Sequence, residues 1–242
     1  MNVDGKVAVI TGASRGLGAG MGEEFRRAGM KLGLCSRSAP ALAAGDGVVA
    51  RELDVVDGDA VDSFAAEVFE RFGHVDLWIN NAGVLAPIAP LRDVASAEFR
   101  RALDVNVLGV FHGTRAYVRQ RSRTDKPGVL VNISSGAAWN GYAGWSAYCA
   151  SKAAVDLMTE SVALEEVDTG LRCYAVAPGV IDTDMQEMIR GCTPEQFPMV
   201  NKFIEMKEHG SFSSVAWVAR HMLELAFGDG NDDVRIRFPA EA

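Results

Sequence analysis

Cysteine is scarce in this sequence, and its spacing is not that of a metal site or a disulfide framework. The chain has four cysteines, Cys35, Cys149, Cys173 and Cys192, with no CxxC pair and no Cys/His ligand spacing. We therefore expect no metal site and no disulfide scaffold. Free thiols fit a reducing compartment, so the expected location is cytoplasmic.

Long apolar runs and an excess of positive charge are also missing. No uninterrupted apolar run reaches the roughly 18 residues of a membrane span. The first residues, MNVDGKVAVIT, contain an early acid and only a short apolar run, unlike a signal peptide. The net charge of −8 argues against a general affinity for nucleic acid or anionic membranes. An anionic ligand would need local positive groups.

What the chain has instead is a regular alternation of short β-rich runs and longer amphipathic segments. Its 242 residues, 48% of them hydrophobic, suit one or two globular domains with a sizeable core. Strands are expected at 6–11, 31–36, 48–53, 75–80, 128–134 and 171–177, with a candidate closing strand at 234–238. Helices are expected at 16–29, 57–73, 96–120, 146–169 and 213–227. This alternation predicts an α/β fold with a doubly wound parallel sheet of about seven strands and helices on both faces.

The segment from about 180 to 212 is the longest stretch without a clear strand, and it is rich in Met and Phe. Long segments of this kind often serve as lids over a binding site. An inserted helical hairpin with no gating role explains the composition equally well.

A glycine-rich turn, Thr11–Gly18 (TGASRGLG), lies between the first strand and the first helix. Glycines allow the backbone to turn sharply and to approach a pyrophosphate, while the helix start offers unpaired amides and a positive dipole end. Glycine also punctuates ordinary strand–helix turns, so the motif alone is weak. Its position after the first strand favours a dinucleotide site.

The end of the second strand reads Cys35-Ser36-Arg37 and contains no acid that could bind an adenosine 2′-hydroxyl. Arg37 and Arg15 could instead bind a 2′-phosphate. This favours NADP(H) over NAD(H) as the cofactor. The alternative is that either arginine is simply a solvated surface residue.

Tyr148 and Lys152 lie four positions apart and share one face if the stretch is helical. A free tyrosine, with a pKa of roughly 10, transfers protons poorly at neutral pH. One cation about 4 Å away, at an effective dielectric near 20, is worth about 4 kcal/mol, enough to lower that pKa by about 3 units. Burial acts in the opposite direction. YxxxK also occurs often by accident on ordinary helices, so other motifs must decide.

Several motifs occur together in a fixed order: TGxxxGxG at Thr11–Gly18, Asn-Asn-Ala-Gly at Asn80–Gly83, Asn106, Ser135, Tyr148xxxLys152 and Pro178-Gly179. In this order they resemble the short-chain dehydrogenase/reductase family, over nearly the whole chain. The resemblance implies a Rossmann-type single domain over residues 1–242, with a substrate lid at about 180–212. The TGxxxGxG spacing and the length are similar to those of the single-domain oxidoreductases of the family.

The resemblance also implies roles for individual residues. Tyr148 would be the acid–base residue, with Lys152 lowering its pKa and binding the nicotinamide ribose. Ser135 would polarise the substrate oxygen, and Asn106 would hold a water that links Lys152 to solvent. The implied cofactor-binding residues, in addition to Tyr148 and Lys152, are Gly12, Ser14, Arg15, Gly16, Leu17, Gly18, Ser36, Arg37, Asp54, Val55, Asn81, Ala82, Gly83, Pro178, Gly179, Ile181 and Thr183.

A narrower likeness lies in the stretch APGVIDTDMQ at 177–186, which resembles the sepiapterin reductase and benzil reductase branch. Those enzymes use NADPH to reduce carbonyls, often of dicarbonyl compounds. Sepiapterin reductases anchor the pterin with an Asp near the C-terminus, and Arg235 stands in the matching stretch here. Because arginine accepts no hydrogen bonds, a broader carbonyl reductase is preferred. A shifted alignment that brings Asp232 or Asp233 into this role leaves sepiapterin reductase open.

The substrate side is predicted from aromatic and methionine residues. Trp139, Trp145 and Met185 are the expected substrate contacts, and they indicate a hydrophobic or aromatic carbonyl compound. Core or subunit packing is the alternative for each of them. Arg190, Lys202 and Lys207 leave an anionic substrate open.

Three alternatives to a reductase of ketones, aldehydes or diketones stay open. An NADP-dependent alcohol dehydrogenase working in the oxidative direction would use the same residues. Sepiapterin reductase is the second, and a non-catalytic nucleotide-sensing protein on the same scaffold is the third. In this family the helices expected at 96–120 and 146–169 pack across a two-fold axis, so the resemblance implies a homodimer or homotetramer.

Overall fold

The computed structural model describes residues 2–124 and 126–241 and contains a seven-stranded sheet. The strands are β1 (Val7–Thr11), β2 (Lys31–Ser36), β3 (Val48–Glu52), β4 (Leu77–Asn80), β5 (Gly128–Ile133), β6 (Leu171–Ala177) and β7 (Arg235–Arg237). Their spatial order is β3-β2-β1-β4-β5-β6-β7, and every neighbouring pair is parallel. The predicted α/β class with a doubly wound parallel sheet is confirmed.

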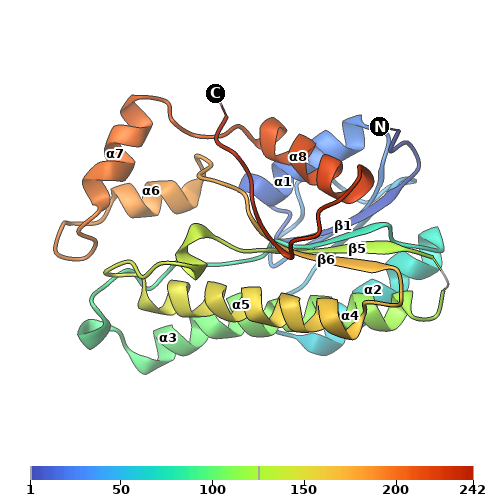
Figure 1. Cartoon of the computed structure of the whole chain (residues 1–242), viewed down its shortest axis with the longest axis horizontal. Helices are drawn as coiled ribbons and strands as arrows, with labels where there is room; N and C mark the ends of the chain where they lie inside the picture. Colours follow the sequence, from blue (N-terminus) through green and yellow to red (C-terminus); the bar gives the residue numbers. More distant parts are fainter. Residues whose placement is uncertain (1, 125, 242) are drawn as a thin grey trace.

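Helices cover both faces of this sheet. They are α1 (Gly16–Arg27), α2 (Gly58–Phe72), α3 (Ser96–Leu103), α4 (Gly109–Arg121), α5 (Ser146–Glu165), α6 (Asp184–Arg190), α7 (Val200–Glu208) and α8 (Val215–Phe227), with short 3₁₀ turns at Leu91–Asp93 and Gly136–Ala138. Helices α1 and α8 lie on one face, and α2, α4 and α5 lie on the other (Figure 1). A separate hydrophobic cluster fills the space on each side. Helices α6 and α7 extend beyond the sheet, at the end of the molecule where α5 begins (Figure 1).

The central strands are buried along their whole length because both of their faces are covered. All residues of β1 (VAVIT), β4 (LWIN) and β5 (GVLVNI) are buried.

Helix α2 shows how local sequence sets the start and the end of a helix. The Asp57 carboxylate accepts from the backbone N–H groups of Asp59 and Ala60, and Gly73, at φ 76°, ends the helix.

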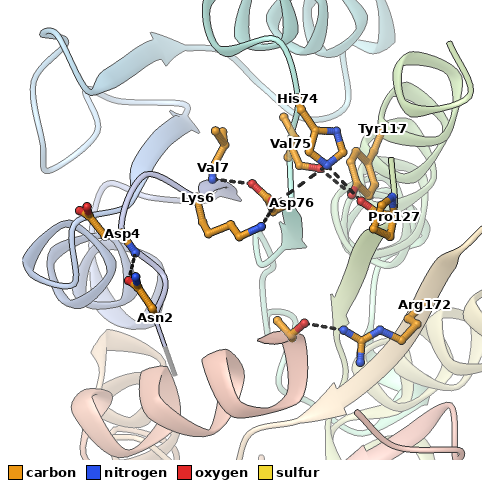
Figure 2. A network of polar contacts seen from close by, with 11 residues as sticks. Asn2, Asp4, Lys6, Val7, His74, Val75, Asp76, Tyr117, Pro127 and Arg172 are labelled. Carbon is orange, nitrogen blue, oxygen red and sulfur yellow. Dashed lines mark hydrogen bonds and ion pairs between the residues drawn. The ribbon is translucent and has the colours of Figure 1, made fainter. Parts of the chain in front are cut away.

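A polar network ties the amino ends of the strands together (Figure 2). The Asp76 carboxylate accepts from the Val7 backbone N–H at 2.9 Å and from the Lys6 ammonium at 2.9 Å. The Tyr117 hydroxyl donates to the Val75 carbonyl at 3.0 Å. These bonds join the starts of β1 and β4, far from the edge where the strand–helix loops gather. The opposite, carboxyl edge is therefore the part of the fold left for a binding site.

One segment differs from the sequence prediction. The long helix expected at 96–120 is interrupted by a π-helical turn, Asp104–Leu108, between α3 and α4. The strand-free stretch after β6 contains two short helices, α6 and α7, whose apolar residues pack with Trp145 and Tyr148 in a third hydrophobic cluster. No helix among residues 2–124 and 126–241 is long and apolar enough to cross a membrane.

Candidate active site

The glycine-rich turn lies directly against the end of β4. The Thr11 hydroxyl accepts from the backbone N–H groups of Asn81 and Ala82, both at 3.0 Å. A Cβ atom on Gly12 would lie 2.8 Å from the Ala82 Cα, and one on Gly18 would collide with the Gly12 carbonyl oxygen. The close packing therefore requires these glycines. Helix α1 begins at Gly16 and directs its unpaired amides toward the same edge.

The end of β2 provides the surroundings expected for the adenosine half of a dinucleotide. Ser36 is buried and donates to the Ser38 carbonyl at 2.8 Å, whereas Arg37 is exposed. Asp54 pairs with Arg101 at 3.0 Å. Burial alone would raise the pKa of Asp54, but bonds from the Val56 N–H and Arg101 lower it overall. The Asp54 carboxylate therefore stays ionised.

Arg15 already has an acidic partner in this structure. Its guanidinium forms an ion pair with Asp184, the first residue of α6, at 2.7 Å. Both side chains are exposed, so the pair is weak and solvent-screened. Arg15 must leave Asp184 before it can bind a phosphate group.

Tyr148, Ser135 and Lys152 converge at the carboxyl end of β5. Tyr148 and Lys152 lie on one face of α5, and a side-chain hydrogen bond joins Tyr148 to Ser135. The Lys152 ammonium donates to the Ile133 carbonyl at 2.8 Å and lies 5.6 Å from the centre of the Tyr148 ring. Both residues are buried. The fold therefore places a phenol, a hydroxyl and an ammonium within one small region.

Burial dominates the electrostatics of this group. It raises the pKa of Tyr148 above its ordinary value, and the hydrogen bond with Ser135 opposes that rise. Burial also lowers the pKa of Lys152 to about 8, against the opposing charge of Asp156. Lys152 is not among the causes that shift the pKa of Tyr148 in this structure, so the lowering of that pKa by Lys152 stays a prediction. The phenol is thus a neutral proton donor over the physiological range.

Asn106 occupies the π-helical turn, and the turn explains its position. Its side chain exchanges hydrogen bonds with Val84, accepting from the N–H and donating to the carbonyl, each at 2.8 Å, and it donates to the Ser151 hydroxyl at 3.0 Å. Its amide oxygen and the Lys152 nitrogen both lie close to Gly83, at 3.3 Å and 3.8 Å from the position of a Cβ atom there. Single π-helical turns are frequent at functional sites. Gly83 leaves the space between Asn106 and Lys152 open.

The loop after β6 reaches back to the glycine-rich turn. The Thr183 side-chain methyl would lie 3.4 Å from a Cβ atom on Gly16. Gly179 has φ 90°, which a residue with a side chain rarely adopts. Ile181 packs against the core cluster on the α1 side. Pro178, Gly179, Ile181 and Thr183 therefore lie along the same edge as the glycine-rich turn.

The segment at 180–212 packs over the start of α5 through aromatic side chains. Trp145 stacks on Phe197 with ring centres 4.6 Å apart, and it meets Phe203 at 5.7 Å and Tyr148 at 5.7 Å. Met185 packs against the same cluster. Trp145 is thus largely occupied by contacts within the chain. Asp182 pairs with Arg190 at 3.0 Å and with Lys207, which joins α6, α7 and the loop after β6.

Trp139 is held differently, through a buried carboxylate that the sequence analysis did not single out. Its indole N–H donates to Asp156 at 2.9 Å, and Asp156 also accepts from the Ser134 hydroxyl. Trp139 remains 36% exposed, whereas Asp156 is only 1% exposed. The position of Asp156, one helical turn after Lys152, was a signal that could have identified it. Arg237, which lies over the Trp139 ring at 4.5 Å, has no comparable signal in the sequence.

In the described ranges, no group of three or more His, Cys, Asp or Glu side chains could hold a metal ion. The residues at the site can instead do three things. The glycine-rich turn can accept a pyrophosphate, Tyr148 can deliver a proton, and Ser135 can donate a hydrogen bond to an oxygen beside it.

Comparison with known proteins agrees with this geometry. The family model for short chain dehydrogenases matches residues 6–192. A 3beta-hydroxysteroid dehydrogenase of Eggerthella lenta is 34% identical over 94% of this chain and 91% of its own. An (S)-benzoin-forming benzil reductase of Bacillus cereus is 31% identical over 91% of this chain and 93% of its own. The crystal structure of the KRED1-Pglu enzyme covers 96% of this chain and 100% of its own at 30% identity, with a TM-score of 0.86. The chain is a single-domain oxidoreductase of the short-chain dehydrogenase/reductase family, which acts on carbonyl or alcohol groups with a nicotinamide cofactor.

Proposed function

We propose that this protein reduces the carbonyl group of a ketone, aldehyde or diketone to an alcohol with NADPH. The observation that carries the proposal is the convergence of Tyr148, Ser135 and Lys152 beside the glycine-rich turn. The phenol is buried and kept neutral, as a proton donor must be before charge develops on the substrate oxygen.

The residues present fit a nicotinamide dinucleotide. The close contact of Gly12 with Ala82 leaves backbone, and no side chain, facing the start of α1. Gly12, Ser14, Gly16, Leu17 and Gly18 would surround the pyrophosphate, Asp54 and Val55 the adenine, and Asn81, Ala82 and Gly83 the adjoining ribose. Pro178, Gly179, Ile181 and Thr183 would contact the nicotinamide carboxamide. When bound, this cofactor supplies the hydride.

The chain's own residues position and protonate the substrate. Ser135 donates a hydrogen bond to the carbonyl oxygen, and Tyr148 transfers its hydroxyl proton to that oxygen as negative charge forms there. Lys152, in its ammonium form, stabilises the resulting phenolate. Asn106 and Gly83 border the space beside Lys152, where a water can return a proton to Tyr148.

NADPH is proposed over NADH because of charge at the end of β2. β2 ends at Ser36 and is followed by the exposed Arg37, without the acid that would bind a ribose 2′-hydroxyl. Arg15 would exchange Asp184 for the 2′-phosphate. A phosphate is the stronger partner because it carries more charge and can accept bidentate bonds from a guanidinium.

The proposed substrates are hydrophobic or aromatic carbonyl compounds. Trp139 is partly exposed beside Ser135, and Met185 lies at the start of α6, so both remain proposed substrate contacts. Trp145 would act mainly through the packing of Phe197 and Phe203. The similarity to a benzil reductase supports a diketone. Sepiapterin is not favoured because Arg235 pairs with Glu160 at 2.5 Å and lies 3.9 Å from Asp156.

Alcohol oxidation with NADP⁺ is the second candidate. It is favoured by similarity to hydroxysteroid and sugar-alcohol dehydrogenases, including a galactitol 2-dehydrogenase of Agrobacterium fabrum that is 34% identical over 78% of this chain. The same residues would serve, with Tyr148 accepting the proton. The ratio of cofactor forms in the cell then decides the direction.

We also propose a lid, an assembly and a location. Residues 180–212 would open and close over the substrate, because α6 and α7 are attached mainly through the aromatic cluster and the Asp182 ion pairs.

Association of two or four copies is supported by exposed apolar residues of the π-helical turn, α4 and α5, namely Leu108, Phe111, Leu157 and Leu164. Free cysteines and a reducing cofactor suit the cytoplasm.

A carbonyl panel tests the proposal. The purified protein is given NADPH with benzil, an aromatic aldehyde, a simple ketone or sepiapterin, and NADPH loss is followed by fluorescence. We expect benzil to be reduced fastest and sepiapterin slowly. Bound NADPH with no reduction of any carbonyl, and no oxidation of the matching alcohols with NADP⁺, would favour the nucleotide-sensing alternative.

A further inference from the structure

Arg237 lies at the carboxyl end of β7, next to the residue that follows Ser135. Strand register pairs Arg237 with Ala177, the last residue of β6 before the Pro178-Gly179 turn. One guanidinium nitrogen, Nη2, would lie 3.3 Å from a Cβ atom on Gly136. The guanidinium therefore lies against the backbone of the residue that follows Ser135. It therefore borders the place where a substrate carbonyl would be polarised.

The guanidinium is held in place by stacking. Its central carbon lies 4.5 Å from the centre of the Trp139 ring, and Trp139 is fixed in turn by its hydrogen bond to the buried Asp156. Stacking on Trp139 occupies one face of the planar guanidinium and leaves the N–H groups at its edge available to a ligand. This arrangement orients the donors before any ligand binds, which reduces the entropy lost on binding.

Arg237 differs from Arg235, Arg190 and Lys207 because it has no carboxylate partner among residues 2–124 and 126–241. Arg235 is neutralised by Glu160 and Asp156, and Arg190 and Lys207 share Asp182. Throughout residues 2–124 and 126–241, no carboxylate lies within 4.0 Å of the Arg237 guanidinium. Arg237 is also exposed, so a ligand can reach it. The sequence left an anionic substrate open because of Arg190, Lys202 and Lys207. Two of these cations, Arg190 and Lys207, are thus already paired with a carboxylate.

We infer that Arg237 is a specificity-determining residue that binds a carboxylate on the substrate, next to the carbonyl that is reduced. Because the guanidinium lies beside the residue that follows Ser135, the fitting class is a 2-oxo carboxylic acid, with an aromatic group that packs beside Trp139. A carboxylate matches the two parallel N–H donors at the edge of the guanidinium. This inference rests on the proposed carbonyl reduction and specifies its substrate class.

A matched pair of substrates isolates the charge. Phenylglyoxylate and its methyl ester share the ring and the reacting carbonyl but differ in the carboxylate. The two compounds are compared with NADPH for the unaltered protein and for Arg237→Gln. A suitable control is Arg220→Gln, because Arg220 also stacks on a tryptophan, Trp217, at 4.6 Å, but on α8 away from the site.

We expect Arg237→Gln to lower kcat/KM for phenylglyoxylate by about 10- to 100-fold, with the loss mainly in KM, since a charged hydrogen-bonding partner is removed. The kcat/KM for the methyl ester should change by less than about threefold, because the ester has no carboxylate for Arg237 to bind. Arg220→Gln should leave both substrates unchanged. Calorimetric binding of phenylglyoxylate to the protein–NADP⁺ complex should weaken in parallel for Arg237→Gln alone.

Equal losses of kcat/KM for the acid and the ester in Arg237→Gln would mean that Arg237 serves only to support Trp139. Unchanged kinetics for both compounds would mean that Arg237 plays no part in substrate binding. Either result overturns this inference while the carbonyl reduction stands. If the unaltered protein binds NADPH but reduces neither compound, nor benzil, the proposed function fails and this inference fails with it. Arg237→Lys keeps the charge without the planar pair of donors, and it should recover part of the lost activity toward the acid.

Discussion

Lys152 and Asp156 lie one turn apart on α5, and both are almost fully buried, with exposed fractions of 4% and 1%. Burial lowers the pKa of Lys152 to about 8, and the Asp156 charge limits that fall. Asp156 also accepts from Ser134, which precedes Ser135, and from Trp139, four residues after Ser135. One carboxylate therefore acts on the charge of Lys152 and also binds two residues near Ser135.

Replacement of the proposed proton donor should separate turnover from cofactor binding. Tyr148→Phe removes the hydroxyl and keeps the ring that packs against Trp145. We expect carbonyl reduction to fall by at least about 100-fold, the lower range for loss of a general acid, while NADPH still binds in a fluorescence titration. Tyr142→Phe, which alters another ring beside Trp145 at 5.2 Å, is the matched control and should stay active. Substantial turnover by Tyr148→Phe would contradict its assignment.

The pH dependence should report the charge of Lys152. Because its pKa is lowered to about 8, the ammonium is present below that pH and is lost as the pH rises through it. We expect kcat/KM for carbonyl reduction to fall above about pH 8 if the ammonium is required. Asp156→Asn removes the charge that holds this pKa up, so the fall should move to lower pH.

Glu160→Gln is the control for this shift, since Glu160 lies one turn further along α5 and pairs with Arg235. Its profile should keep the original falling limb. If the falling limb of the kcat/KM pH profile is unchanged in Asp156→Asn, and circular dichroism shows an intact fold, then Asp156 does not set the charge of Lys152.

Cofactor preference should follow the arginine at the end of β2. We expect NADPH to bind more tightly than NADH, and Arg37→Ala to reduce the difference by about 10-fold, as for loss of one charged hydrogen-bonding group. NADH affinity should hardly change, because it has no 2′-phosphate. Arg27→Ala, which removes an exposed arginine paired with Glu24 on α1, serves as the control. Equal dissociation constants for NADPH and NADH in the unaltered protein would refute the arginine argument.

The aromatic cluster over α5 should contribute strongly to stability. Phe197 is fully buried and stacks on Trp145 at 4.6 Å, so Phe197→Ala should lower the free energy of unfolding by about 3 kcal/mol. Leu91→Ala, at an exposed residue of the 3₁₀ turn, should cost far less. Urea denaturation of the two variants gives the comparison. Similar losses for both would mean that the cluster is not a stabilising unit. Raised KM values in Phe197→Ala would support the lid.

Much of the fold was predictable because its signals are local. The runs of β1, β4 and β5 are mostly apolar at consecutive positions, which is typical of a parallel sheet covered on both faces. Turn glycines such as Gly12 carry a steric requirement that can be recognised from their spacing after a strand. Tyr148 and Lys152 share a face because the period of the helix puts them there.

Helix interruptions and ion pairs were not predictable in this way. The π-helical turn at Asn106 is stabilised by bonds to Val84 and Ser151, which come from other parts of the chain. The sequence suggested that Arg15 binds phosphate, yet its partner here is Asp184, brought close by the turn after β6. Such partners are set by tertiary contacts that no periodicity encodes.

The sequence by itself determined the order of strands and helices, the glycine-rich turn and the spacing of Ser135, Tyr148 and Lys152, because each depends on residues close together in the chain. Only the tertiary structure decided the electrostatics of the site. Burial, not the nearness of two side chains, raises the pKa of Tyr148 and lowers that of Lys152. Register between β6 and β7 likewise places Arg237 beside Gly136, from the far end of the chain.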